Sequence, residues 1–332
     1  MFRLPRLAAV TALALALGLL ATTPAVAGGP TVSDPRVLAH FDLAAGQTPE
    51  NIALVPDGSV DVTLAYARQV ANVSRNGATR ILATLPDVAN PKTPLLGRAL
   101  VTGIARADDG TLFVDYATGT SETGIWRIDP GGGAPRQIAQ LPPGGLPNGL
   151  ALDERRGALY VADSVLGTVW RVPCTGGTPA AWAGGAALEP GSPVPPAYGI
   201  GVNGLRFHNG AVWVSNTDAG TVLRIPVEQD GSAGAIETRA TGLAGIDDFN
   251  FVSRHSDTAL AALMIANQVA LIQADGSHTI VLTQQSGLSN PSSVAVRGHT
   301  AYVTNSGYFS QPGGEGGPNL LVARVHQRYP GQ

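Results

Sequence analysis

The sequence contains little cysteine, little lysine and little charge of either sign. Cys174 is the only cysteine in 332 residues, so no disulfide can form within the chain and its stability must come from its core. Charged residues account for 14% of the chain, the net charge is −3, and no run of basic residues occurs. These features argue against nucleic acid or an anionic membrane surface as a partner.

The motifs of several common enzyme classes are also missing. No Gly-x-Ser-x-Gly elbow, Cys-x-x-Cys pair or phosphate-binding glycine loop is present, which disfavours serine-triad hydrolysis and nucleotide chemistry. Cys174 lies in a predicted turn between two outer strands, a position that does not favour a nucleophile. Four histidines fall in or beside predicted turns and are expected to be mostly solvated: His208, His255, His278 and His299.

The one long apolar run lies at the N-terminus. Leu7 to Leu20 is almost wholly apolar, follows two arginines and precedes Ala25-Val26-Ala27, the small-x-small pattern that signal peptidase accepts. We expect residues 1–27 to be a signal peptide, which predicts a secreted protein. The run is shorter than the roughly 20 residues of a membrane span, so no membrane association is expected after cleavage.

The remaining chain is rich in turn-forming residues and shows no helical period. It includes most of the 42 glycines and 25 prolines, and short alternating apolar runs lie between them, which is typical of an all-β protein. Stacking these runs reveals a four-strand unit repeated about every 45 residues. The innermost strands of six units are predicted to begin near residues 50, 102, 148, 203, 247 and 292.

Six such units predict a six-bladed β-propeller, with four-stranded antiparallel blades around a central channel. Residues 28–332 would form this single domain. The last unit lacks an obvious outer strand, so we expect residues 35–43 to supply it and close the ring, which protects two sheet edges. Three long connections, near 88–100, 185–200 and 306–318, are predicted to lie over one mouth of the channel, where long loops often carry function.

Equivalent positions at the starts of the six inner strands should converge on that mouth. All six are polar: Glu50, Thr102, Asn148, Asn203, Asp247 and Ser292. Buried carboxylates and amides need partners, and oxygen-only ligation suits a hard divalent cation. We predict one cation held by Glu50, Asn148, Asn203 and Asp247; Ca²⁺ is favoured, with Mg²⁺, Mn²⁺ or Zn²⁺ as alternatives. Two points stay open: Asp248 competes with Asp247, and each Asn-Gly pair is also typical of an ordinary turn or bulge.

Three segments resemble the SMP-30/gluconolactonase/LRE-like superfamily. They are Pro147-Asn148-Gly149-Leu150-Ala151-Leu152-Asp153 through Tyr160-Val161-Ala162-Asp163-Ser164, the parallel Asn203-Gly204-Leu205, and Glu50. The resemblance extends over the chain after the signal peptide. It implies a six-bladed propeller with one cation at the channel mouth, lactone or ester hydrolysis, Asp247 as ligand and catalytic base, and substrate contacts from Thr102 and Asn203.

The chain also departs from that family. Glu50-Asn51-Ile52 replaces the usual Glu-Gly-Pro, Thr102 stands where an Asn often touches substrate, and Asp247-Asp248 replaces Asp-Gly. The cation site remains expected, whereas specificity for sugar lactones is not. The expected function is metal-dependent hydrolysis of a small lactone or ester outside the cytoplasm, with a small molecule as partner. The alternatives are a non-catalytic ligand- or protein-binding propeller and a strictosidine-synthase-like or lyase activity.

Overall fold

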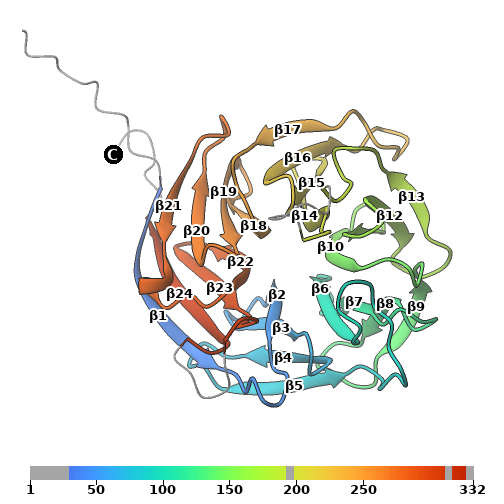
Figure 1. Cartoon of the computed structure of the whole chain (residues 1–332), viewed down its shortest axis with the longest axis horizontal. Coiled ribbons are helices and arrows are strands. Elements are labelled where there is room, and N and C mark those ends of the chain that lie inside the picture. The colour runs from blue at the N-terminus through green and yellow to red at the C-terminus, as the bar shows by residue number, and fades with distance from the viewer. Residues whose placement is uncertain (1–29, 192–197, 311–315, 327–332) are drawn as a thin grey trace, which may run out of the picture.

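The strands and turns of this chain are arranged as a ring of six antiparallel sheets around a central channel (Figure 1). The computed structural model describes residues 30–191, 198–310 and 316–326. The six-bladed, all-β prediction is confirmed: the described residues contain 24 strands and a single short 3-10 turn, η1 (Gln284–Ser286). No described helix is long and apolar enough to cross a membrane. The predicted signal peptide, residues 1–27, lies outside the described residues.

Blades one to three follow in chain order, and each runs from the channel outward. Blade one consists of β2 (Pro49–Leu54), β3 (Val60–Leu64), β4 (Gln69–Val73) and β5 (Thr79–Thr84). Blade two consists of β6 (Leu100–Arg106), β7 (Leu112–Ala117), β8 (Gly124–Ile128) and β9 (Arg136–Gln140). Blade three consists of β10 (Pro147–Asp153), β11 (Ala158–Asp163), β12 (Thr168–Pro173) and β13 (Ala180–Ala183).

Blades four to six complete the ring. Blade four consists of β14 (Val202–His208), β15 (Ala211–Asn216), β16 (Thr221–Pro226) and β17 (Glu237–Ala240). Blade five consists of β18 (Ile246–Ser253), β19 (Ser256–Leu263), β20 (Gln268–Ile272) and β21 (His278–Leu282). Blade six consists of β22 (Pro291–Arg297), β23 (Thr300–Asn305), β24 (Asn319–His326) and β1 (Thr31–His40).

The N-terminal strand β1 supplies the outer edge of blade six, beside the last strand of the chain (Figure 1). Its bounds, Thr31–His40, differ from the predicted 35–43. It starts earlier because β24 extends to His326, which pairs with Thr31. The register shifts between Ser33 and Arg36, where Asp34 adopts a positive φ of 52°. The closing contact therefore joins the two ends of the folded chain.

The core is a ring of apolar layers between neighbouring blades rather than one central cluster. Alternate side chains of each strand face opposite sides of their sheet, so every blade contributes to two layers. The layer between blades four and five contains Trp213, Phe249 and Phe251, and the layer between blades three and four contains Tyr160. This packing fixes the blades around the channel and makes the inner strands a rigid frame.

Each inner strand begins with a β-bulge next to the channel mouth. The register with the second strand shifts after the first or second paired residue, for example between Pro147 and Leu150. The corresponding shifts occur in all six blades. Bulges re-aim side chains and are frequent beside active sites. The six polar positions predicted to converge all lie within these bulges.

The Asn-Gly pairs are parts of bulges, not of hairpin turns. A Cβ atom on Gly149 would lie 2.3 Å from the backbone oxygen of Asn203 in the next blade. Glycine is required there because the backbones of neighbouring blades approach closely at the channel. The residue before it, Asn148, is thereby held at the mouth of the channel.

Candidate functional site

A cavity of about 340 Å³ lies at the mouth of the channel where the inner strands begin. We call this the front mouth. All five predicted site residues line it, from the bulges of five blades: Glu50, Thr102, Asn148, Asn203 and Asp247. Ser292, the sixth residue of the set, instead donates a hydrogen bond to the Pro49 backbone oxygen at 2.9 Å.

The three long connections contribute the outer wall of the same cavity. Apolar and aromatic side chains come from each of them: Leu95 and Leu96, Tyr198 and Ile200, and Tyr308 and Phe309. Tyr198, Gly199 and Ile200 are held by Asp218, whose carboxylate accepts hydrogen bonds from their backbone N–H groups at 2.7–3.0 Å. The described parts of these loops thus form a defined, largely apolar rim around the polar residues.

Glu50 is a buried carboxyl group held by one hydrogen bond from Tyr308. Only 7% of Glu50 is exposed, and the Tyr308 hydroxyl donates to its carboxylate. The Tyr308 ring rests against Tyr66, with centroids 5.4 Å apart. Burial raises the pKa of Glu50 to about 7; the Tyr308 hydrogen bond opposes this shift and the charge of Asp248 adds to it. Glu50 therefore takes up a proton readily unless a cation lies beside it.

Asp247 and Asn203 form a second buried pair. The Asn203 Nδ2 donates to Asp247 Oδ1 at 2.9 Å and to Thr217 Oγ1 at 2.9 Å. This leaves the Asn203 Oδ1 buried with no hydrogen-bond partner in the described part of the chain. Burial, and then the charge of Glu50, raise the pKa of Asp247 well above its usual value. An unpaired carbonyl oxygen beside a carboxylate is a donor set that a cation would satisfy.

Asn148 and Thr102 complete the ring with different surroundings. The Asn148 Nδ2 donates to Ser164 Oγ at 3.3 Å. Thr102 is only 1% exposed, and its hydroxyl donates to the Pro147 backbone oxygen at 2.9 Å. This bond links blades two and three. The predicted role of Thr102 in binding substrate therefore stays a prediction, because its hydroxyl is already used as a donor within the ring.

The two neighbouring aspartates of blade five face different groups. Asp247 lines the cavity, whereas the Asp248 carboxylate accepts hydrogen bonds from Arg206 and from Ser293 Oγ, the latter at 2.8 Å. Asp248 thus belongs to a network one residue further along the inner strands, which also includes Asn51. The geometry favours Asp247 over Asp248 as the residue that faces a ligand.

The donors at the front mouth fit a hard divalent cation. Two carboxylates and two amides face the cavity, and no basic side chain is among its described lining residues. Within the described parts of the chain, no three His, Cys, Asp or Glu side chains gather as a metal site. Any cation here would therefore depend on the amide oxygens of Asn148 and Asn203 as well as on Glu50 and Asp247.

Searches against known proteins identify relatives by structure only. No protein-family model and no curated protein sequence matches the chain. The calcium-binding protein regucalcin from Agrobacterium tumefaciens is similar in structure at 16% identity, with a TM-score of 0.65 over 90% of this chain and 96% of that one. The gluconolactonase XC5397 from Xanthomonas campestris gives 16% identity and a TM-score of 0.60, over 90% and 98%.

A third similar structure has a different activity. The PQQ-bound aldose sugar dehydrogenase from Streptomyces coelicolor matches with 16% identity and a TM-score of 0.61, over 90% of this chain and 98% of that one. At these identities the similarity establishes the propeller fold and not the chemistry. Gluconolactonase- and regucalcin-like propellers are nevertheless among the structural neighbours, in agreement with the resemblance seen in the sequence.

Several residues of the site were not predicted from the sequence. No sequence motif marks Tyr66, which packs against Tyr308, or Asp218, which holds the backbone of residues 198–200. Both residues act through contacts between segments far apart in the chain. One expectation about histidine was wrong: His208 is only 8% exposed, because it stacks on Phe251 and pairs with Asp257 at 3.2 Å. The position of His208 beside a turn did not reveal that Phe251 of the neighbouring blade covers its imidazole.

Proposed function

We propose that this protein hydrolyses a small lactone or ester at its front mouth, with one divalent cation bound by Glu50, Asn148, Asn203 and Asp247. The observation that carries the proposal is the buried Asn203 Oδ1, which has no hydrogen-bond partner among the described residues. It belongs to a cavity whose described lining includes two carboxyl groups and no basic side chain. Ca²⁺ is favoured because all four side chains offer oxygen. The similarity to a calcium-binding propeller supports this choice.

Each residue around the cation would have a separate role in hydrolysis. The cation, when bound, would polarise the substrate carbonyl as a Lewis acid. Asp247 would accept a proton from the attacking water, since its carboxylate lines the cavity where the substrate would lie. Asn203 donates to Asp247 and so fixes the orientation of that carboxylate. Tyr308 holds Glu50 in the same manner.

The rim of the cavity indicates the class of substrate. Leu95, Ile200 and Phe309 line its outer part, and few polar side chains are available beyond the proposed ligands. A polyhydroxylated sugar lactone would leave most of its hydroxyl groups without partners, which is costly on desolvation. We therefore propose a lactone or ester with an apolar substituent, and a cavity of about 340 Å³ accommodates a small molecule of this kind.

The test is a substrate panel with the mature protein and Ca²⁺. It compares alkyl-substituted γ- and δ-lactones, glucono-δ-lactone and aryl esters, with and without a chelator. We expect chelator-sensitive turnover that is fastest on the alkyl lactones, and a loss of kcat/KM of about 100-fold or more in Asp247→Asn. No chelator-sensitive turnover by cation-loaded protein would refute the hydrolase proposal and favour a binding propeller. Elimination products would favour the lyase alternative.

We also propose that the protein acts outside the cytoplasm. The basic start, the apolar run and Ala25-Val26-Ala27 support export. N-terminal sequencing of protein recovered outside the expressing cells should begin at Gly28. Recovery only inside the cells, with Met1 or Phe2 retained, would contradict export.

A further inference from the structure

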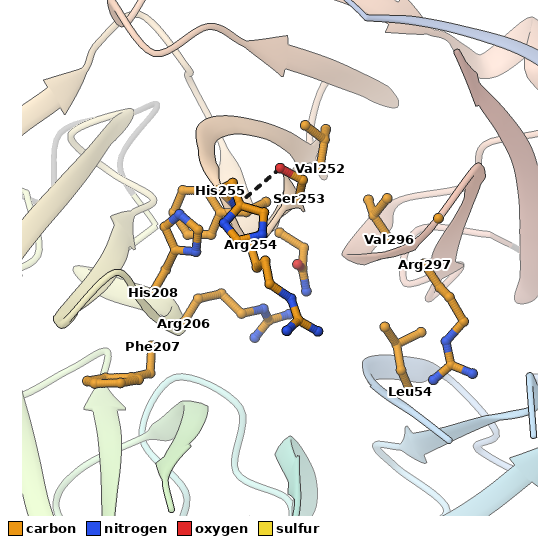
Figure 2. A pocket seen from close by; sticks show the side chains of 13 residues that line it. Leu54, Arg206, Phe207, His208, Val252, Ser253, Arg254, His255, Val296 and Arg297 are labelled. Atoms are coloured by element: carbon orange, nitrogen blue, oxygen red, sulfur yellow. Dashed lines mark hydrogen bonds between the residues drawn. The ribbon is translucent and has the colours of Figure 1, made fainter. Parts of the chain in front are cut away.

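A second cavity, of about 600 Å³, lies at the opposite end of the inner strands. It is lined by the last residues of β2, β14, β18 and β22 and by the turns that follow β18 and β22 (Figure 2). The front-mouth residues lie at the beginnings of the same strands. The second cavity therefore opens at the other end of the channel, which we call the rear mouth. Nothing in the proposed hydrolysis uses it.

The rear mouth is cationic although the protein is acidic. Three arginines and two histidines line it: Arg206, Arg254, Arg297, His208 and His255. No aspartate or glutamate is among its described lining residues, whereas the whole chain has a net charge of −3. Clustered cations in a concave, low-dielectric wall focus a positive potential on the space between them. The natural ligand for such a space is an anion.

The three arginines differ in how far their charge is already balanced. Arg206 donates to Asp248, although its buried Nε has no hydrogen-bond partner among the residues that the structure describes. Arg297 donates to the Val55 backbone oxygen. Arg254 is exposed and forms no ion pair with any described carboxylate. Figure 2 shows Arg206 and Arg254 extending from adjacent blades toward the middle of the ring.

Apolar side chains make up the remainder of the wall. Leu54 and Val296 lie on one side of the cavity and Phe207 on the other (Figure 2). These side chains are only partly buried, although the Phe207 ring stacks on Tyr160 and packs into the layer between blades three and four. His208 adds little charge, because burial lowers its pKa and its ring is already paired with Asp257. An arginine fork beside an apolar wall suits an oxyanion joined to an apolar group.

We propose that the rear mouth is a binding site for a small organic anion, a carboxylate or phosphate monoester that carries an apolar group. Arg254 is the principal recognition residue, and it acts with Arg206. The apolar group lies against Leu54 and Val296. The site is separate from the front mouth, because the network of Arg206, Asp248 and Ser293 lies between them.

Calorimetric titration of the mature protein with phenyl phosphate tests this proposal. We expect saturable binding that is tighter than for inorganic phosphate or phenol and is weakened by salt. Arg254→Gln should weaken it about tenfold, the equivalent of one charge-assisted hydrogen bond. Arg155→Gln, which changes an exposed arginine in the β10–β11 turn outside the cavity lining, should leave it unchanged.

Two results would overturn the proposal: no saturable binding, or equal binding by wild type and Arg254→Gln. The charge reversal Arg254→Glu provides a second variant, and it should abolish binding while leaving the melting temperature close to that of the wild type. Because Arg254 is exposed and makes no ion pair with a described carboxylate, loss of fold is not expected in either variant. The front-mouth cation does not depend on Arg254, so binding there would be unaffected by these changes.

Discussion

Glu50 and Asp247 are two buried carboxyl groups that line one cavity. Two ionised carboxylates in such a place are unfavourable unless a cation lies between them or a proton is bound. Burial is the main cause of both raised pKa values. Mutual repulsion adds to the effect at Asp247. A proton and a divalent cation must therefore compete for the same oxygens, which couples metal affinity to pH.

This competition predicts that Ca²⁺ affinity falls as the pH drops below about 7, the pKa of Glu50. Tyr308→Phe should move this loss to higher pH, because the Tyr308 hydrogen bond lowers the pKa of Glu50. Calcium titrations at several pH values measure both effects. Affinity that is independent of pH across this range, or a midpoint unchanged in Tyr308→Phe, would contradict the account.

Asp115 is a buried acid at a position where three other blades use a hydroxyl and two use alanine. By strand register it corresponds to Thr63, Ser215 and Thr304. Each of these hydroxyls donates to a backbone oxygen of the next blade, as Thr63 does to Thr102 at 2.6 Å. Neither carboxyl oxygen of Asp115 has a hydrogen-bond partner within the described ranges. Burial, and secondarily the charge of Asp163, raise the pKa of Asp115 well above its usual value.

Asp115→Thr should stabilise the protein, and the gain should grow with pH. The folded wild type keeps a proton that the unfolded chain releases at a pKa of about 3.9, so its stability falls as the pH rises from there toward the folded pKa. The advantage of the variant should increase by about 1.4 kcal/mol per pH unit over that window. Urea unfolding at two pH values measures it. A difference that does not change with pH would contradict a protonated Asp115.

The closing strand shows how one element holds the whole ring. β1 pairs along β24, and Ala39 packs into the apolar layer between blades six and one. Ala39→Asp would place a carboxylate in that layer and should lower the free energy of unfolding by about 3 kcal/mol. Arg36→Asp changes an exposed residue of the same strand and is the matched control. Thermal unfolding should give a lower melting temperature for Ala39→Asp than for Arg36→Asp. Equal melting temperatures would show that the packing of this strand does not stabilise the ring.

At the level of elements, the repeat made much of the fold predictable. Short strands, Gly-rich turns and a period of about 45 residues depend on local chemistry, so the six inner strands could be located within a few residues. The end of the closing strand was harder to predict. Its length depends on how far β24 extends on the other side of the contact.

At the scale of the whole molecule, the candidate site residues could be predicted because they occupy equivalent positions in successive blades. Their neighbours in sequence did not identify them. Glu50, Asn148, Asn203 and Asp247 occupy matching bulges, so a symmetry argument brought them to one mouth. The repeat could not reveal the link between Arg206 and Asp248. That contact joins two blades at the channel, and only packing determines which charges meet there.

The rear mouth is a property of the ring and not of any one blade. Its arginines come from β14, from the turn after β18 and from β22, and they are separated by up to 91 positions between Arg206 and Arg297. No sequence window contains them together. Two chemically opposite mouths, one acidic and one basic, thus arise at the two ends of the ring of inner strands.

A calcium titration of metal-free protein measures whether the front mouth binds a cation. We expect one Ca²⁺ per wild-type chain and at least a tenfold loss of affinity in Glu50→Gln. The control is Asp61→Asn, which alters a buried carboxylate on β3 that already accepts a hydrogen bond from Asn72 at 2.8 Å; it should bind like the wild type. Equal binding by wild type and Glu50→Gln, or no binding by the wild type, would contradict the account.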